Sequence, residues 1–310
     1  MVELRAPFAA SLSITSACDL ACDYCYSSKT PKTILETGTA LRIIDELLNE
    51  KWLFYLTIAG GEPLAHPGIL EIITHSFTRY FGRVQLLSNA TRLCNDNFFS
   101  KFSEICEVLH RNGTPLNIQV SVDSVDTSIH NLHRGKGRLV MLAIDRLLSL
   151  PVHVQLGCVI TNDNVNVADQ IIEYYYPRIS NFHFMNLILA QGGGDYERWR
   201  GIRPATFDAL VAFHKKILQK EVRFPGIRVT KLIDGTTETI KGTMKGKGCL
   251  AGITRIDIEA NLDIKACCMA DSLMGNLGRQ SFEDIWHSEA AEQIRSKTEA
   301  LCVAPNYVCS

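Results

Sequence analysis

Three cysteines stand close together near the start of the chain, in the stretch CDLACDYC at positions 18–25. Cys18, Cys22 and Cys25 are separated by three and two residues, and Tyr24 precedes the last of them. A structural zinc site uses four protein ligands, and this loop supplies no fourth. Three thiolates on one short loop suit a 4Fe–4S cluster whose remaining iron stays open to an outside ligand. The spacing therefore predicts an iron–sulfur site.

The other cysteines fall into two groups. Cys94, Cys106 and Cys158 are scattered among apolar residues, and we expect them to be small buried side chains. The second group follows residue 248 and consists of Cys249, Cys267, Cys268, Cys302 and Cys309. No apolar run approaches the roughly 18 residues of a membrane span, and the N-terminus lacks the pattern of a signal peptide. We therefore expect a cytoplasmic protein, in which clustered thiols indicate metal binding or catalysis rather than disulfides.

Composition limits the classes of partner. The chain has 310 residues, 46% of them hydrophobic, which is enough for one large domain with or without a small appendage. The formal net charge of -1 gives no overall attraction to polyanions. We accordingly predict neither a nucleic acid nor a membrane surface as partner.

The elements that must position the cysteines alternate along the first two thirds of the chain. Strand-like runs occupy residues 8–15, 54–59, 83–88, 117–122, 152–160 and 181–188. Runs with helical spacing lie between them, at 39–51, 68–80, 95–109, 138–150 and 167–176. Such alternation predicts an α/β fold with a parallel sheet. Six units are too few for a closed eight-stranded barrel, so the prediction is a partial (β/α)6 barrel.

The pattern changes after residue 200. A helix is expected at 206–220, then a loop rich in Gly and Lys, strands at 253–258 and 262–266, and a helix from about 282 to 297. We predict three parts: a barrel over 1–200, a linker helix and loop over 201–248, and a small cap that carries cysteines over 249–310.

CDLACDYC, together with GGEP at 60–63 after the second strand, resembles the signatures of radical S-adenosylmethionine (SAM) enzymes. The resemblance implies that Cys18, Cys22 and Cys25 bind a 4Fe–4S cluster and that SAM chelates its open iron. Reduction then yields a 5′-deoxyadenosyl radical that abstracts hydrogen. The implied SAM contacts are Tyr24 against the adenine, Gly60, Gly61, Glu62, Pro63, Ser88, Asn89, Ser121, Asp123, and Arg134 for the carboxylate.

Three of these contacts have an alternative interpretation. Ser88 and Asn89 are equally consistent with a turn cap. Arg134 lies in HNLHRGKG at 130–137, which we expect to be a loop, and it is equally consistent with a solvated surface charge.

The segments 249–267 and 275–295 resemble the cap of SPASM and twitch members of this family. The resemblance implies a twitch-like cap with one auxiliary 4Fe–4S cluster, for which five thiols are available and four are needed. We favour Cys249 as the free thiol, with Cys267, Cys268, Cys302 and Cys309 as ligands. In the alternative, Cys249 is a ligand and Cys267 or Cys268 is free.

A spare thiol suits an epimerase, because inversion needs a hydrogen atom returned from the opposite face of the carbon. The resemblance extends to radical SAM epimerases of aminoglycosides and implies conversion of neomycin C to neomycin B, with Cys249 as hydrogen donor. The implied partners are a small-molecule aminoglycoside and an electron donor such as flavodoxin or ferredoxin. Two alternatives remain: an amino-sugar dehydrogenase, and a peptide-modifying enzyme. Against the latter, no N-terminal peptide-binding domain fits before residue 8.

Overall fold

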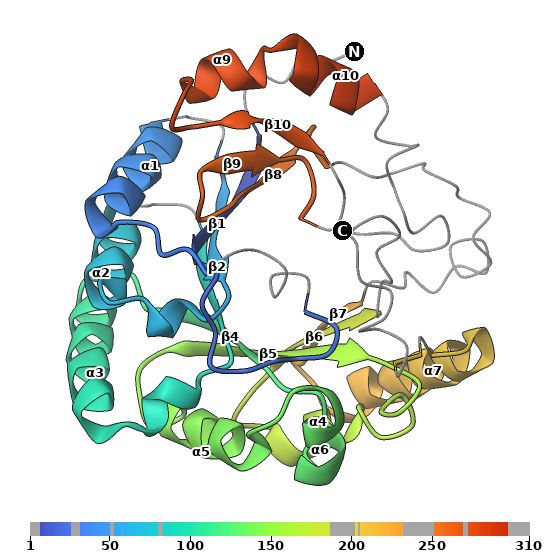
Figure 1. The fold of residues 1–310 in the computed structure, drawn as a ribbon. Helices are drawn as coiled ribbons and strands as arrows, with labels where there is room; N and C mark the ends of the chain where they lie inside the picture. Colours follow the sequence, from blue (N-terminus) through green and yellow to red (C-terminus); the bar gives the residue numbers. More distant parts are fainter. Residues whose placement is uncertain are drawn as a thin grey trace.

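The computed structural model describes residues 7–25, 32–49, 53–79, 83–186, 202–203, 205–231, 251–268 and 272–296. Its strands form one sheet in the order β10-β9-β8-β1-β2-β3-β4-β5-β6-β7. Seven neighbouring strands run parallel: β1 (Ala9–Thr15), β2 (Tyr55–Gly60), β3 (Arg83–Ser88), β4 (Asn117–Ser121), β5 (His153–Ile160), β6 (Asn181–Asn186) and β7 (Arg228–Lys231). The sheet curves around an axis, and helices cover its outer face (Figure 1).

The helices between the strands are α1 (Thr37–Asn49), α2 (Ile69–Arg79), α3 (Asp96–Arg111), α4 (Thr127–His133), α5 (Gly137–Leu147), α6 (Gln170–Tyr175) and α7 (Phe207–Arg223). Two short 3₁₀ turns, η2 (Pro63–Ala65) and η3 (Thr91–Cys94), follow β2 and β3. The expected partial barrel is therefore present, with β7 as an additional strand. Sequence reasoning missed β7 because a strand of four residues is too short to show alternation.

Strand residues alternate between two different environments. Leu12, Ile58 and Val120 are fully buried in the core against the helices. Their neighbours Ser11, Thr57 and Gln119 point to the inner face of the curved sheet, because successive side chains of a strand point in opposite directions. In a closed barrel of this type the inner face is filled by bulky apolar side chains. Here it is polar, and several of its residues, among them Ser11 and Thr57, are only partly buried.

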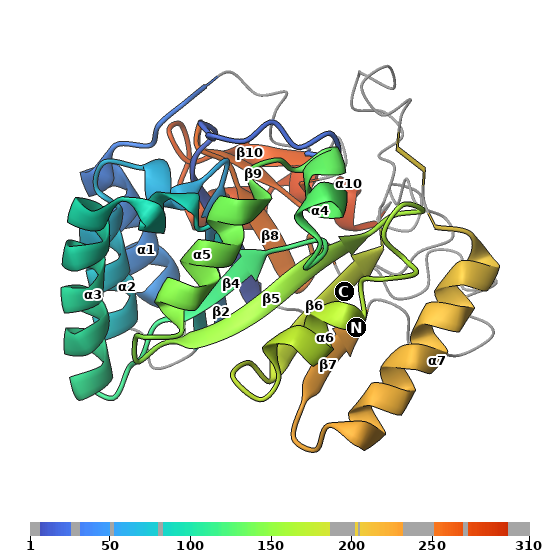
Figure 2. The same ribbon diagram turned by 90° about the horizontal axis from the view of Figure 1, so that it is seen from below.

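The cap continues the same sheet. Strand β8 (Arg255–Ile258) pairs parallel with β1, from Ala9 opposite Arg255 to Leu12 opposite Ile258. Strands β9 (Asp263–Lys265) and β10 (Leu273–Asn276) follow as antiparallel neighbours. Figures 1 and 2 show these strands, in orange, beside the blue strand β1. The cap strands are thus held to the barrel by backbone hydrogen bonds.

Three local expectations differ from the structure. Residues 127–133 form helix α4 instead of a loop, because Asp126 accepts a hydrogen bond from the backbone N–H of Ser128 and caps the helix. The helix expected at 282–297 is two helices, α9 (Phe282–Trp286) and α10 (Glu289–Ser296). Ser288 separates them by accepting a hydrogen bond from the N–H of Ala291 at 3.1 Å. Cys106 and Cys158 are buried as predicted, but Cys94 is only partly buried.

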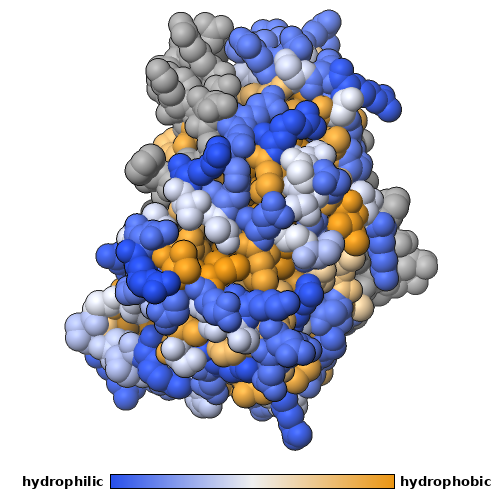
Figure 3. Space-filling view, turned by 90° about the vertical axis from the view of Figure 1, so that its left-hand side faces the viewer, coloured by the Kyte–Doolittle hydropathy of each residue, from blue (hydrophilic) through white to orange (hydrophobic). Residues whose placement is uncertain are grey.

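The outer surface on the side of α1, α2 and α3 is mostly hydrophilic, with apolar side chains showing between the polar ones (Figure 3). Within the described ranges no helix has both the length and the apolar character needed to cross a membrane.

Candidate active site at the carboxyl ends of the strands

The cysteine loop begins directly after β1 and packs against the end of β2. The N–H of Gly61 donates to the carbonyl of Thr15 at 2.6 Å, and the N–H of Glu62 donates to that of Ala17 at 2.8 Å. A Cβ on Gly60 would stand 2.1 Å from the Thr15 oxygen, and one on Gly61 would stand 2.4 Å from the Ala17 oxygen. Gly60 also has a φ of 137°, which favours glycine. The two glycines therefore let GGEP fix the start of the cysteine loop.

The thiols of the loop fit an iron–sulfur cluster. Burial raises the pKa of Cys18 to about 11 and also raises the pKa of Cys22, so both are neutral thiols in the chain alone. A cationic metal centre would favour their thiolate forms. The Cys18 sulfur already accepts a hydrogen bond from the N–H of Leu20 at 3.4 Å, the kind of contact that tunes cluster thiolates.

A single metal ion fits this loop less well. No three His, Cys, Asp or Glu side chains of the described residues are gathered closely enough to hold a metal ion. Zinc draws its thiolates to within about 2.3 Å of one centre. A cluster gives each thiolate its own iron, which suits a loop that supplies three cysteines and no fourth ligand.

Glu62 is buried and links the ends of two strands. Its Oε1 accepts hydrogen bonds from the N–H of Leu64 at 2.9 Å and the hydroxyl of Ser88 at 2.7 Å. Its Oε2 accepts one from the N–H of Asn89 at 2.7 Å. Burial outweighs these hydrogen bonds and raises the pKa of Glu62 to about 7. The structure thus brings together Glu62, Ser88 and Asn89, three of the predicted SAM contacts.

The alternative interpretation of Ser88 and Asn89 also holds. The hydroxyl of Ser88 accepts from the N–H of Ala90 at 2.8 Å, and the side-chain oxygen of Asn89 accepts from that of Thr91 at 3.0 Å. Both residues therefore shape the turn before η3 while they contact Glu62. Pro63 is buried at the start of η2.

Asp19 is a site residue that sequence reasoning missed. It accepts hydrogen bonds from Asn89 at 2.8 Å, Thr91 at 2.7 Å and Lys136 at 2.8 Å. Although burial opposes them, these contacts lower the pKa of Asp19. Asp19 thereby ties the residue after Cys18 to the end of β3. The sequence offered one indication of this role: Asp19 is a charged residue between two of the clustered cysteines.

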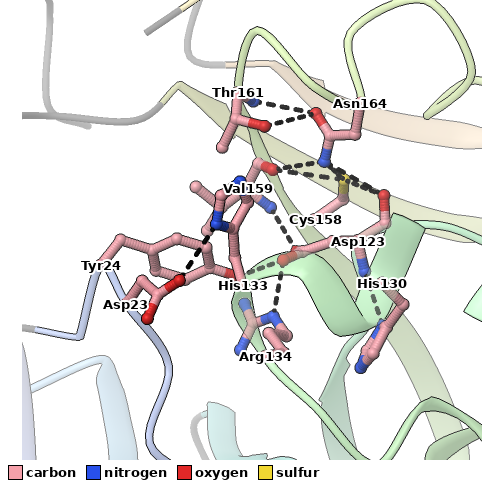
Figure 4. Close-up of polar contacts among 10 residues, drawn as sticks. All are labelled: Asp23, Tyr24, Asp123, His130, His133, Arg134, Cys158, Val159, Thr161 and Asn164. Carbon is pink, nitrogen blue, oxygen red and sulfur yellow. Dashed lines mark hydrogen bonds and ion pairs between the residues drawn. The ribbon is translucent and has the colours of Figure 1, made fainter. Parts of the chain in front are cut away.

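Asp123 is the centre of a buried network at the end of β4 (Figure 4). Its Oδ2 accepts hydrogen bonds from the phenol of Tyr24 and from Nε of Arg134, the latter at 2.9 Å. Its Oδ1 accepts one from the N–H of Val159 at 3.1 Å. The guanidinium of Arg134 stands 5.1 Å from the centre of the Tyr24 ring. Arg134 is therefore a buried ion-pair partner and not a solvated surface charge.

Helix α4 holds the middle of the cysteine loop. The N–H of Asp23 donates to the carbonyl of His133 at 2.9 Å. The His133 ring lies between two carboxylates, 3.2 Å from Asp23 and 2.9 Å from Asp163. His130, one turn earlier, is buried, and its Nδ1 accepts from the N–H of Asp123 at 3.3 Å. Neither histidine belongs to a metal-binding group among the residues described.

The ends of β4 and β5 are joined by Asn164. Its side-chain amide donates to the carbonyl of Asp123 at 3.1 Å and to that of Val159 at 2.8 Å, while its oxygen accepts from the N–H of Thr161 at 2.8 Å (Figure 4). Ser121, the remaining predicted SAM contact, pairs with Gly157 on the inner face near this junction. The network links the carboxyl ends of β4 and β5.

Two cap cysteines lie together after β9. The N–H of Cys267 donates to the hydroxyl of Ser272 at 3.0 Å, and that of Cys268 donates to Asp257 at 3.1 Å. A hydrogen bond between the two thiols, followed by burial, raises the pKa of Cys268 well above its usual range. Cys249, Cys302 and Cys309 lie outside the described residues. The ligand set of an auxiliary cluster and the role of Cys249 therefore stay predictions.

Two family models match the two parts of the chain that carry clustered cysteines. A model of the radical SAM superfamily matches residues 12–174, and a model of an iron-sulfur cluster-binding domain, SPASM, matches residues 249–308. Mycofactocin maturase MftC of Mycolicibacterium smegmatis is 26% identical over 96% of this chain and 74% of its own length. The antilisterial bacteriocin subtilosin biosynthesis protein AlbA of Bacillus subtilis is 22% identical over 94% of this chain and 62% of its own length.

Solved structures show the same fold. Streptococcus suis SuiB bound to precursor peptide SuiA superposes with a TM-score of 0.76, at 15% identity, over 94% of this chain and 67% of that one. An α/β partial barrel with a C-terminal SPASM domain is therefore the architecture of this chain.

Proposed function

This chain belongs to the radical SAM superfamily, and we propose that it modifies a peptide. Membership implies SAM and a 4Fe–4S cluster, and the SPASM domain implies auxiliary iron–sulfur binding. When bound, these cofactors supply a deoxyadenosyl radical that abstracts a hydrogen atom. We assign the first cluster to Cys18, Cys22 and Cys25, and the SAM amino group to Glu62.

The composition of the inner face carries the proposal. The inner-facing residues of β1 to β6 are chiefly hydroxyls and amides, including Gln85, Gln119 and Gln155. None of these strand residues is acidic. The carboxylate of Asp123, two residues beyond β4, is already bonded to Tyr24 and Arg134, and Asp257 on β8, opposite Ser11, is buried. Amide side chains both donate and accept hydrogen bonds, which suits the backbone of a peptide. A polycation would need carboxylates that these strands do not offer.

Relatives support the same substrate class. SuiB was solved with a precursor peptide bound, AlbA takes part in bacteriocin biosynthesis, and MftC is a maturase. The aminoglycoside epimerase expected from the sequence finds no support in these comparisons. The peptide-modifying alternative fits them better. Hydrogen return by Cys249 stays part of the proposal, because a thiol serves any radical that must be quenched.

The test uses cluster-reconstituted protein with SAM and a reductant in deuterated water. One sample receives synthetic peptides translated from the short reading frames that flank the gene, as candidate precursor peptides, and a second receives neomycin C. We expect the peptide alone to change, either by losing two hydrogens or by gaining one deuterium, as read by mass spectrometry. The matched control replaces Cys18, Cys22 and Cys25 by Ala and should leave the peptide unchanged. Conversion of neomycin C with an untouched peptide would refute the proposal.

A further inference from the structure

Polar side chains on the inner face link neighbouring strands, and two of these contacts reach across an intervening strand. The hydroxyl of Tyr55 on β2 donates to Oε1 of Gln85 on β3 at 2.8 Å, and Nε2 of Gln85 donates to Gln155 on β5 at 2.6 Å. In a second contact, Gln119 on β4 lies 3.2 Å from His183 on β6. Barrel curvature brings alternate strands together on the inner side. These contacts therefore mark the inner face of the barrel.

Gly157 on β5 makes the second contact achievable. It pairs with Ser121 on one side and with His183 on the other, so it lies between β4 and β6. A Cβ at this position would stand 2.5 Å from Nε2 of Gln119 and 3.0 Å from its Cδ. The missing side chain lets Gln119 cross β5 and reach His183. This is a specific arrangement of three residues on three successive strands.

The contact with Gln119 sets the tautomer of His183. In the orientation that the Gln119 amide has here, its Oε1 faces Nδ1 of His183 and can only accept, so Nδ1 carries the hydrogen. Burial lowers the pKa of His183, which keeps the ring neutral and leaves a lone pair on Nε2. That Nε2 has no hydrogen-bond partner among the residues that the structure describes, and His183 as a whole is only partly buried. Its neighbours Phe182 and Phe184 point the other way, into the core.

An unpaired buried acceptor is unfavourable for the fold. Leaving such a group without a partner costs the free energy of its lost hydration, and most buried polar atoms in native proteins avoid this. A ligand that supplies the missing partner would offset this cost. An oriented ring with a free lone pair is what a ligand with a hydrogen to donate would use.

We propose that Nε2 of His183 accepts a hydrogen bond from the substrate. The donor class is an N–H or O–H group, and, resting on the proposed function, it is a backbone amide N–H of the bound peptide. His183 shares its row of the sheet with Ser121, which precedes Asp123 by two residues. The contact therefore lies roughly 7 Å along the strand direction from the Tyr24–Asp123 contact. Gln119 is the positioning residue that fixes the ring.

The test measures the protonation and hydrogen bonding of the two ring nitrogens of His183. Cluster-reconstituted protein with ¹⁵N-labelled histidine is followed by NMR, and His183 is assigned by comparison with the His183→Gln variant. We expect a protonated Nδ1 and a bare Nε2 in the protein alone. Titration with N-methylacetamide, a small amide donor, should shift Nε2 toward the hydrogen-bonded lone-pair position. The candidate precursor peptide should produce the same shift.

Binding measurements complete the design. His183→Phe should weaken peptide binding about tenfold, the usual effect of one lost hydrogen bond, and leave SAM binding unchanged. His153→Phe, at an exposed position that begins β5, should change neither. Gln119→Leu should alter the tautomer ratio of His183.

The inference is overturned if Nε2 is protonated, if it is bonded only to an ordered water, or if neither N-methylacetamide nor peptide moves its signal. It is also overturned if wild type and His183→Phe bind the peptide equally. A wild-type protein that binds no peptide would instead refute the proposed function. The amide titration then still decides the role of His183.

Discussion

The carboxylate of Asp123 accepts a hydrogen bond from the phenol of Tyr24, which lies 99 residues earlier in the chain. Arg134 donates to the same oxygen and stacks its guanidinium near the Tyr24 ring. Tyr24 stands between Cys22 and Cys25, so this contact ties the cysteine loop to the end of β4. The contact therefore anchors this part of the cysteine loop to the barrel.

Replacing Tyr24 by Phe should loosen that loop. The ring stays and only the hydroxyl is lost, so we expect a folded protein destabilised by about 1–2 kcal/mol. Iron should leave the reconstituted variant faster than wild type when a chelator is added. Chemical denaturation and loss of the visible cluster absorbance measure the two effects. Tyr174→Phe, at an exposed position on α6, is the control; equal iron loss in all three proteins would contradict the prediction.

Gly61→Val should reduce binding of the cluster as well as binding of SAM. A Cβ at Gly61 meets the carbonyl oxygens of Ala17 and Ser16, the two residues that precede Cys18. The collision is with backbone, so the start of the cysteine loop must move. We expect reduced iron content after reconstitution together with weaker SAM binding. Gly38→Ala is the control, because its Cβ meets only the flexible end of Glu36. Full iron content in Gly61→Val would show that the loop tolerates the shift.

Glu62 should make both stability and SAM binding depend on pH. Its folded pKa is about 7, above the ordinary value of 4.5. A raised pKa means that the neutral form is favoured on folding. The corresponding stability, about 3 kcal/mol at most, is present below pH 4.5 and is lost as pH rises through 7. Glu62→Gln should remove this slope from denaturation curves, and Glu71→Gln, exposed on α2, should keep it.

SAM carries an ammonium group, which favours the ionised form of Glu62. Binding of SAM near pH 6 should therefore release a proton from this carboxyl. Calorimetry in two buffers of different ionisation enthalpy measures that proton. Absence of proton release in wild type, or equal release in Glu62→Gln, would count against contact between Glu62 and the ammonium.

Replacing Cys18, Cys22 and Cys25 together by Ala should remove one cluster and all SAM cleavage. The expected loss is about four irons per chain, because one cubane is missing. Cys106→Ala is the control, since Cys106 is buried in α3 away from the strand ends. It should lose stability but retain its iron and its activity. Iron analysis and deoxyadenosine formation distinguish the two variants.

Much of this fold follows from local pattern. Leu12, Ile58 and Val120 belong to apolar runs whose length and β-branched content indicate buried strands. Such patterns do not identify the two short strands β7 and β10. They form because of pairing with neighbouring strands more than because of their own residues. Helix α4 was missed because its sequence, TSIHNLH, has little helical periodicity. Its stability comes from the cap at Asp126 and from contacts with the cysteine loop.

The site residues also divide into those that a local sequence pattern identifies and those that it does not. Cys18 and Glu62 could be found from spacing, since their motifs are contiguous. Asp19 and His183 could not, because their roles depend on partners that are distant in sequence, Lys136 in one case and Gln119 in the other. Assigning alternate residues of each barrel strand to opposite faces of the sheet would have placed Gln119 on the inner face. It would not have shown that the absence of a side chain at Gly157 leaves room for Gln119 to reach His183.

The parallel pairing of β8 with β1 makes the two domains depend on each other for solubility. Without residues 251–296, the backbone N–H and carbonyl groups of Ala9–Leu12 would form an uncovered sheet edge. A barrel cut off before the cap would then offer a template for intermolecular strand pairing beside the cysteine loop. A chimera in which this cap is replaced by the cap of a relative would therefore need a strand that pairs with β1, whatever chemistry the new cap supports.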